Sequence, residues 1–293
     1  MDSLTFKSYG KINLTLEIIN KRIDGYHNLF SIMQTIDLFD IITFSESSKI
    51  EIECNNKEIN ESGNIIEKAI TLLKDYSHTK KGIRISLDKN IPISAGLGGG
   101  SSNAAIVLIV LNTIWNLKIN TPTLHRLSSM IGSDVPFFLK GGTALTQGRG
   151  EKIKRLPKIQ KLWILLVPEK NVMKDKTQQI YNNLLSSDYS DGSYTLELQK
   201  IIKKKQKISH LSIINSLRES AMQLFQNLEK TESKMIQAGA KAVHLSGSGP
   251  TLFSMHHTKK EAVKVKQLLG EHAINSILTT TIDDSRWSKS CMG

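Results

Sequence analysis

The sequence is poor in cysteine, and its apolar runs are short. Two cysteines occur among 293 residues, Cys54 and Cys291, which excludes a disulfide framework or a zinc pattern and suits a reducing cytoplasm. The longest uninterrupted apolar run, Ala104 to Leu111, is far shorter than the about 20 residues of a membrane-spanning helix. The first residues lack a basic start followed by an apolar stretch, so we expect no signal peptide. These absences predict a soluble cytoplasmic protein that does not act in a membrane.

Acidic side chains are also scarce relative to basic ones. The chain has 39 Lys and Arg against 27 Asp and Glu, which gives a formal net charge of +12 at pH 7. This excess attracts polyanions, and both nucleic acid and small substrates with several phosphates belong to that class. The lysine-rich stretch at 201–208 is interpreted as a solvated surface segment. Charge alone does not choose between the two kinds of partner.

Both strand and helix patterns are present, which predicts a globular α+β protein. Residues 9–18 alternate apolar and polar side chains, as expected of a strand with one core face, and the other face carries Lys11 and Asn13. Further strands are expected at 30–39, 82–87, 163–167, 240–245, 251–255 and 274–280, and a hairpin within 141–150. Helices are expected at 64–73, 104–115, 121–131 with Thr121 as N-cap, 177–185, and 259–269 ended by Gly270. A boundary near Pro157 divides the chain into domains 1–157 and 158–293.

The most informative segment is Gly96-Leu97-Gly98-Gly99-Gly100-Ser101-Ser102, which directly precedes an apolar helix. Closely spaced glycines let backbone N–H groups approach an anion, and the N-terminus of the following helix favours negative charge at the same point. The two serines add hydroxyl donors. The alternative is a flexible turn, but so many glycines would cost much conformational entropy in a mere turn. The segment lacks the Gly-Lys-Ser/Thr ending of a Walker A loop. It therefore predicts another kind of polyphosphate cradle.

Residues 92–102 resemble the second motif of the GHMP kinases, the superfamily named for galactokinase and homoserine, mevalonate and phosphomevalonate kinases. The triple glycine followed by Ser-Ser-Asn-Ala-Ala is similar to the diphosphocytidyl-methylerythritol kinase branch, since other branches more often carry Gly-Leu-Gly-Ser-Ser. The resemblance implies that ATP binds at this loop, with Asn64 and Lys89 on the adenine side. The implied ATP-binding residues are Asn64, Lys89, Pro92, Ile93, Ser94, Ala95, Gly96, Leu97, Gly98, Gly99, Gly100, Ser101 and Ser102.

Two residues are candidates for catalysis. Phosphoryl transfer to an alcohol needs a group that orients or deprotonates the hydroxyl, and positive charge to offset the charge on the transferring group. From the sequence alone Asp134 could be a helix N-cap, but Gly132-Ser133-Asp134-Val135-Pro136-Phe137 is similar to the motif that holds the catalytic base of this branch. Lys11 could be a surface lysine, but Lys11-Ile12-Asn13-Leu14 resembles the opening motif of the family. The resemblance implies that Lys11 lies beside Asp134 and polarises the acceptor hydroxyl.

The implied acceptor site includes an aromatic residue and a histidine. Asp24-Gly25-Tyr26-His27 could be a turn with a packing tyrosine, but it resembles a segment of this branch whose Tyr and His hold the cytosine of the substrate. The resemblance places Tyr181 on the opposite face of the cytosine. It also places Asn13 in the acceptor site, together with Ser246 and Gly247 of the third glycine motif. Where the family usually shows Val-Ser-Thr, this chain reads Val172-Met173-Lys174-Asp175-Lys176-Thr177, so the loop is altered.

These resemblances imply a two-domain kinase with a ribosomal-protein-S5-like N-terminal domain, a ferredoxin-like C-terminal domain and the active site between them. The implied reaction is ATP-dependent phosphorylation of the 2-hydroxyl of a cytidine diphosphate derivative of methylerythritol, in non-mevalonate isoprenoid synthesis. Mg²⁺ is expected with the ATP phosphates, although the sequence does not indicate its ligands. A homoserine or mevalonate-type kinase and a basic RNA-binding module are the rivals. The Asp24 to His27 motif disfavours the first. The second lacks the interleaved aromatic and basic residues expected of it, so no nucleic acid partner is expected. Monomer and dimer both remain open.

Overall fold

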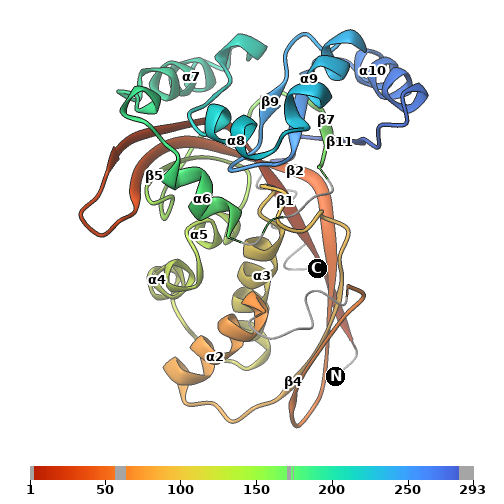
Figure 1. The fold of residues 1–293 in the computed structure, drawn as a ribbon. Helices are drawn as coiled ribbons and strands as arrows, with labels where there is room; N and C mark the ends of the chain where they lie inside the picture. The colour runs from red at the N-terminus through yellow and green to blue at the C-terminus, as the bar shows by residue number, and fades with distance from the viewer. Residues whose placement is uncertain (1–2, 57–63, 170–172, 174, 284–293) are drawn as a thin grey trace.

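The computed structural model describes residues 3–56, 64–169, 173 and 175–283 (Figure 1). It contains a seven-stranded sheet with the path β3-β4-β2-β1-β8, to which β5 and β6 are joined through β2, and a four-stranded sheet of order β11-β7-β10-β9. Helices cover both sheets, and this arrangement confirms the predicted two-domain α+β class. Cys291 lies outside the described residues.

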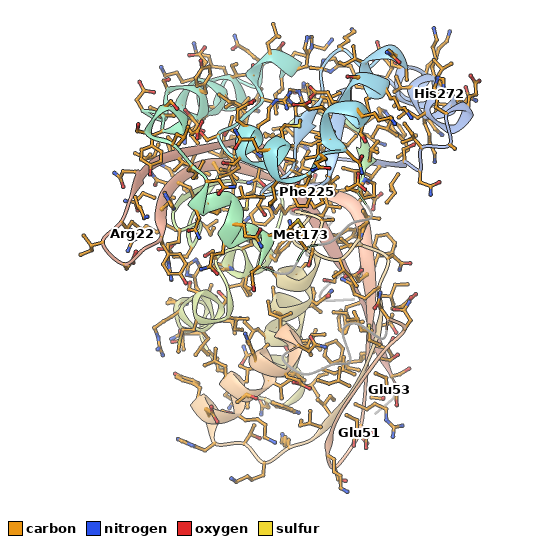
Figure 2. All side chains as sticks on the ribbon, viewed as in Figure 1. Arg22, Glu51, Glu53, Met173, Phe225 and His272 are labelled. Carbon is orange, nitrogen blue, oxygen red and sulfur yellow. The ribbon has the colours of Figure 1, made fainter. Side chains whose placement is uncertain are left out.

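A long β-hairpin forms the centre of the larger sheet. Strands β1 (Leu4–Lys21) and β2 (His27–Ser45) pair antiparallel over their whole length, and Arg22 projects from the turn that joins them (Figure 2). Three register irregularities interrupt the ladder, between residues 9 and 11, 13 and 15, and 18 and 20. Residues 8–18 of β1 are almost all buried. The predicted strand is therefore confirmed, but its polar face is enclosed as fully as its apolar face.

In the first half of the chain one helix packs directly against this hairpin, and other helices pack around that helix. Helix α3 is buried on most sides because its sequence is apolar almost throughout, and it lies against β1 and β2. It begins at Gly99, not at Ala104 as predicted, because the glycine segment itself forms the first turn. The elements of this half are β3 (Ile50–Cys54), α2 (Ile65–Ser77), β4 (Ile83–Asp88), α3 (Gly99–Ile114), α4 (Thr121–Ile131), α5 (Val135–Phe138), β5 (Thr143–Gly148) and β6 (Lys152–Arg155).

The predicted cap of α4 is wrong by one residue. The side chain of Asn120 accepts a hydrogen bond of 2.9 Å from the backbone N–H of Thr123, and Thr121 is the first helical residue. Asn and Thr are both good N-caps, so the sequence offers two adjacent candidates. The helix ends before Gly132, as predicted.

The second half of the chain forms the smaller, fully antiparallel sheet and further helices, and it also adds strand β8 to the larger sheet. Helix α10 runs through Gly270 to Glu271, so the predicted stop at that glycine is wrong, and Thr258 and Glu261 form a capping box at its start. The elements are β7 (Trp163–Val167), α6 (Lys176–Asn182), the 3₁₀ turn η1 (Ser186–Asp188), α7 (Ser193–Lys203), the turn η2 (His210–Ser212), β8 (Ile214–Asn215), α8 (Arg218–Leu224), α9 (Leu228–Gln237), β9 (His244–Leu245), β10 (Leu252–His256), α10 (Lys259–Glu271) and β11 (Ile277–Thr280).

Helix α7, which the sequence analysis missed, is anchored to β1 by a buried carboxylate. Glu17 is fully buried, and its carboxylate accepts hydrogen bonds from the Ser190 hydroxyl and, at 2.6 Å, from the backbone N–H of Thr195 in the first turn of α7. A helix N-terminus favours a negative charge, which explains a buried carboxylate at this place. Beyond Ile202 the side chains of Lys203, Lys204 and Lys205 are exposed, as expected for a solvated segment.

We expect Glu17→Gln to lower the free energy of unfolding by about 1–3 kcal/mol, because an amide removes the charge and turns one acceptor into a donor. Urea denaturation followed by circular dichroism measures this loss. Glu197→Gln, an exposed glutamate on the same helix, is the matched control and should change stability by less than about 0.5 kcal/mol. Equal stability of the two variants would contradict the anchoring role of Glu17.

Candidate active site

A large cavity lies between the two halves of the molecule. Its wall combines the glycine segment, the middle of β1, the turn before His27, and residues of α6 and of the loop after β9. These residues include Gly96, Lys11, Tyr26, Tyr181 and Gly247. Met173, which also lines it, lies near the middle of the molecule in Figure 2. Segments from both sequence halves therefore enclose one space, which we call the central cavity.

Lys11 and Asp134 meet in this cavity although they are far apart in sequence. Lys11 Nζ lies 3.5 Å from Asp134 Oδ2 and donates a hydrogen bond of 2.7 Å to Asn13 Oδ1. Asn13 in turn donates to the Ser31 hydroxyl at 2.8 Å. Lys11 is buried, whereas the Asp134 side chain is 29% exposed. The predicted contact is confirmed, and it leaves the carboxylate accessible from the cavity.

Asp134 stands at the N-cap position of α5, yet its side chain makes no capping hydrogen bond. The alternative that the sequence left open, a helix N-cap, is therefore confirmed for the position of Asp134, but its carboxylate does not cap the helix. Gly150 is a close neighbour, because a Cβ built on it would lie 3.8 Å from Asp134 Oδ1. A small residue there keeps one side of the carboxylate uncrowded.

Two glycines of the segment, Gly96 and Gly98, pack too closely against their neighbours to carry a side chain. At Gly96, with φ +78°, an added Cβ would lie 2.1 Å from the backbone oxygen of Ser246. At Gly98, with φ +72°, it would lie 2.8 Å from the Phe138 ring and 3.0 Å from Lys11 Cγ. Gly98 is also the N-cap of α3 and has no side chain that could occupy the first N–H groups of the helix. These donors are left for an anion, and Gly98 lies next to Lys11.

The loop after β9 closes against the glycine segment from the C-terminal half. The Ser246 hydroxyl donates to the Gly96 carbonyl at 3.0 Å, and a Cβ on Gly247 would lie 3.0 Å from Lys11 Nζ. Gly247 and Ser248 line the cavity, whereas Ser246 holds the two loops together from behind.

Among the predicted ATP-binding residues, Leu97 and Ser102 do not line the cavity. Leu97 packs in the core, and Ser102 accepts a hydrogen bond of 2.8 Å from the Ser8 hydroxyl.

The predicted adenine-side residues are held by a polar network that the sequence analysis missed. Lys89 forms an ion pair with the fully buried Asp40, whose carboxylate also accepts from the backbone N–H groups of Asn90 and Ile91 at 2.8 Å and from Asn103 Nδ2 at 2.9 Å. The sequence signal for this network was the acidic residue Asp40, which stands among the apolar residues of an expected strand. Lys89 thus lines the cavity while it fixes the segment that leads into the glycine loop.

Asn64 has a structural contact of its own. Its side chain accepts a hydrogen bond of 3.0 Å from the backbone N–H of Ile66 and so caps α2. It also lines the central cavity, on the side of Lys89 and Asn103.

Aromatic rings gather at another part of the cavity wall. The His27 and Tyr181 rings lie 5.3 Å apart between centroids with an interplanar angle of 37°, and the Tyr189 ring lies 6.0 Å from His27. Burial, with a smaller contribution from Lys21, lowers the pKa of His27, so the imidazole is neutral at pH 7 and offers one donor and one acceptor. Burial, with help from the Asp134 charge, raises the pKa of Tyr181. A neutral pair of rings that can stack and form hydrogen bonds suits a nucleobase.

Tyr26 differs from its neighbour His27 in being 54% exposed. Its ring lies 4.8 Å from the guanidinium of Arg149, another residue that the sequence analysis missed, and both side chains line the cavity.

The altered loop is only partly described, since residues 170–172 and 174 lie outside the described part of the chain. Of the rest, Met173, Asp175, Lys176 and Thr177 line the cavity.

Within the described residues no group of three or more His, Cys, Asp or Glu side chains could hold a metal ion by itself. The same part of the chain contains no helix with the length and apolar character needed to cross a membrane.

Two family models match the chain: the GHMP kinases N terminal domain over residues 64–142 and the GHMP kinases C terminal domain over residues 197–275. The first spans α2, the glycine segment and Asp134, and the second spans the loop that closes against them. The fold and the cavity therefore define a small-molecule kinase of the GHMP class, which uses ATP.

Relatives narrow this class. A 4-diphosphocytidyl-2-C-methyl-D-erythritol kinase of Dehalococcoides mccartyi is 36% identical over 280 residues, which cover 95% of this chain and 98% of the relative. The protein of the same name from Thermodesulfovibrio yellowstonii is 38% identical over 266 residues, covering 89% of this chain and 92% of the relative. A crystal structure of 4-(cytidine 5'-diphospho)-2C-methyl-D-erythritol kinase superimposes with a TM-score of 0.79 at 26% identity, covering 95% and 99% of the two chains. The chain belongs to the 4-diphosphocytidyl-2-C-methyl-D-erythritol kinase family.

Proposed function

We propose that the protein transfers the γ-phosphoryl group of ATP to the 2-hydroxyl of 4-diphosphocytidyl-2-C-methyl-D-erythritol, a step of non-mevalonate isoprenoid precursor synthesis. The observation that carries this proposal is that one cavity holds the Lys11–Asp134 pair, the glycine segment beside it, and the neighbouring rings of His27 and Tyr181. The names of the relatives supply the identity of the acceptor.

In the proposed reaction the glycine segment and the N-terminus of α3 hold the ATP phosphates through backbone N–H groups. The acceptor oxygen attacks the γ-phosphorus, the bond from that phosphorus to the β,γ-bridging oxygen breaks, and ADP leaves. Asp134 takes the proton of the acceptor hydroxyl. Lys11, whose ammonium lies 3.5 Å from that carboxylate, offsets the negative charge on the transferring group.

We place the cytosine of the acceptor between Tyr26, His27 and Tyr181, with Asn13 and Gly247 along the path from the base to the reacting hydroxyl. Ser246 acts behind Gly247 by holding the loop against Gly96. The neutral His27 can pair with an amide-like ring edge through one nitrogen. We also place the domain boundary near Pro157, which follows the last residue of β6 and precedes β7 of the other sheet.

Mg²⁺ fits this site as a companion of the nucleotide. The ion usually keeps several waters and binds through substrate phosphates and one or two protein oxygens, so it needs no cluster of carboxylates. The Ser101 hydroxyl, in the first turn of α3 and on the cavity wall, is a protein oxygen close to the expected phosphate position. When bound, Mg²⁺ neutralises the β- and γ-phosphates.

The test is ADP release with Mg-ATP and a panel of acceptors: 4-diphosphocytidyl-2-C-methyl-D-erythritol, methylerythritol phosphate without the cytidine, homoserine and mevalonate. We expect turnover with the first acceptor and a kcat/KM at least about 10²-fold lower with the others, since they lack the base that His27 and Tyr181 would hold. Preferred turnover of homoserine or mevalonate would refute the proposed acceptor while leaving the kinase class intact. Turnover with none of the four would refute the reaction.

A further inference from the structure

Lys176, the first residue of α6, is a buried cation that the proposed reaction has not used. It is 6% exposed, and its ammonium donates hydrogen bonds to the Gly249 carbonyl and, at 3.4 Å, to the Ser248 hydroxyl. Both partners are neutral. Among the described residues no carboxylate lies within ion-pair distance of it, whereas the two other lysines on this wall, Lys11 and Lys89, are paired with Asp134 and Asp40.

A buried charge without an opposite charge is costly, and proteins normally pair it or neutralise it. Burial, together with repulsion from Lys11, lowers the pKa of Lys176 to about 8. An ammonium has three N–H donors, and the two neutral partners leave one for a ligand. Because Lys176 lines the central cavity, an anionic group of a bound molecule can provide the opposite charge.

The surroundings indicate which part of a ligand would reach Lys176. Its ammonium lies at the Gly249 end of the loop after β9, while Lys11 Nζ lies beside Gly247 of the same loop. The two lysines therefore flank one short loop. Thr177, whose hydroxyl is 3.0 Å from the Ser248 hydroxyl, adds a further polar group on the side of Lys176.

Lys176 and Tyr181 of the base site lie on the same helix, α6, and both line the central cavity. Tyr181 follows Lys176 by five residues, which corresponds to about 7.5 Å along a helix axis. That distance is similar to the span of a nucleoside from its base to its 5′-phosphate. A nucleotide whose base stacks on Tyr181 would thus bring its diphosphate to Lys176, with the acceptor hydroxyl beyond it near Lys11.

We propose that Lys176 binds the diphosphate of the acceptor and so selects a cytidine diphosphate derivative over an uncharged cytidine derivative. This role rests on the proposed function and adds a specificity-determining residue to it. Lys176 belongs to the segment 172–177, in which the sequence of this chain departs from the pattern of its family. Lys11 then serves the reacting centre, and Lys176 serves the part of the acceptor that does not react.

The experiment measures the affinities of CDP and cytidine by isothermal titration calorimetry, for the wild type and for Lys176→Met, Lys176→Arg and Lys200→Met. Cytidine lacks the charge but fills the base site, so its binding reports correctly folded sites in each variant. We expect the wild type to bind CDP more tightly than cytidine, and Lys176→Met to weaken CDP binding by about 10- to 100-fold without changing cytidine binding. The exposed Lys200, on α7, is the matched control for loss of one positive charge and should change neither affinity.

Lys176→Arg keeps the charge and should retain most of the preference for CDP, which a purely structural lysine would not predict. With the kinase substrates, Lys176→Met should raise KM for the acceptor far more than KM for ATP. An unchanged ratio of CDP to cytidine affinity in Lys176→Met would overturn the role of Lys176 and leave the proposed function standing. Failure of the wild type to bind CDP would overturn both.

Discussion

Asp134→Asn is expected to lower kcat by about 10²- to 10⁴-fold while both KM values change little. A positioned base contributes a factor of that size to proton transfer, and an amide of the same shape cannot accept the proton. The geometry adds a second loss, because Lys11 Nζ loses the carboxylate that lies 3.5 Å away. Steady-state ADP release, with each substrate varied in turn, measures the effect.

The melting temperature separates a chemical effect from a folding defect. Asp134 makes no capping hydrogen bond and its side chain is 29% exposed, so the variant should unfold within a few degrees of the wild type. Glu53→Gln removes a carboxylate from an exposed position on β3, at the edge of the molecule in Figure 2, and should leave kcat unchanged. A kcat of Asp134→Asn within threefold of the wild type would contradict the role of the base.

Asp40→Asn should cause the largest loss of stability of the variants considered, about 3–5 kcal/mol. The carboxylate is fully buried, and it pairs Lys89 while it accepts from Asn103 and from two backbone N–H groups. An amide would leave the Lys89 charge buried without its partner and would turn an NH₂ group toward other donors. Urea denaturation measures the change.

The same substitution should raise KM for ATP, because the backbone of Asn90 and Ile91 leads directly into the glycine segment and is held by Asp40. Glu51→Gln is the matched control, since it breaks the exposed ion pair with Arg84 and should cost less than about 1 kcal/mol. If Asp40→Asn also lowers the free energy of unfolding by less than about 1 kcal/mol, the expected importance of the buried Asp40–Lys89 pair for stability is contradicted.

The parts of the fold that follow local rules could be predicted from the sequence. Strand β7 matches its predicted bounds, since a short β-branched and apolar run between polar segments has few alternatives. Helix α9 was missed because most of its side chains are polar and it buries two apolar ones, Leu228 and Met235. Helix α10 passes Gly270 because a single glycine lowers helix propensity by only about 1 kcal/mol and can be tolerated in the last turn.

In the candidate site, local sequence patterns predict the glycine segment but not the contacts between residues that are far apart in the chain. The glycine segment could be interpreted directly, because close backbone approach to an anion requires its composition. The partnership of Lys11 with Asp134 could be expected only from a family resemblance, since 123 positions separate them. Asp40 and Lys176 were missed for the same reason: their partners, Asn103 and Gly249, lie 63 and 73 residues away. No local pattern marks such contacts.

The most direct test of the proposed reaction is the structure of its product. Phosphorus NMR without proton decoupling can be recorded after incubation of the wild type with Mg-ATP and 4-diphosphocytidyl-2-C-methyl-D-erythritol. Carbon 2 of the acceptor carries a methyl group and no hydrogen, so a phosphate on its oxygen has no proton on the ester carbon to couple with. We predict a new phosphomonoester signal that lacks this coupling and grows in step with ADP. A signal split by an ester-carbon proton would place the phosphate on another hydroxyl, and the absence of any new phosphomonoester would contradict the proposed function.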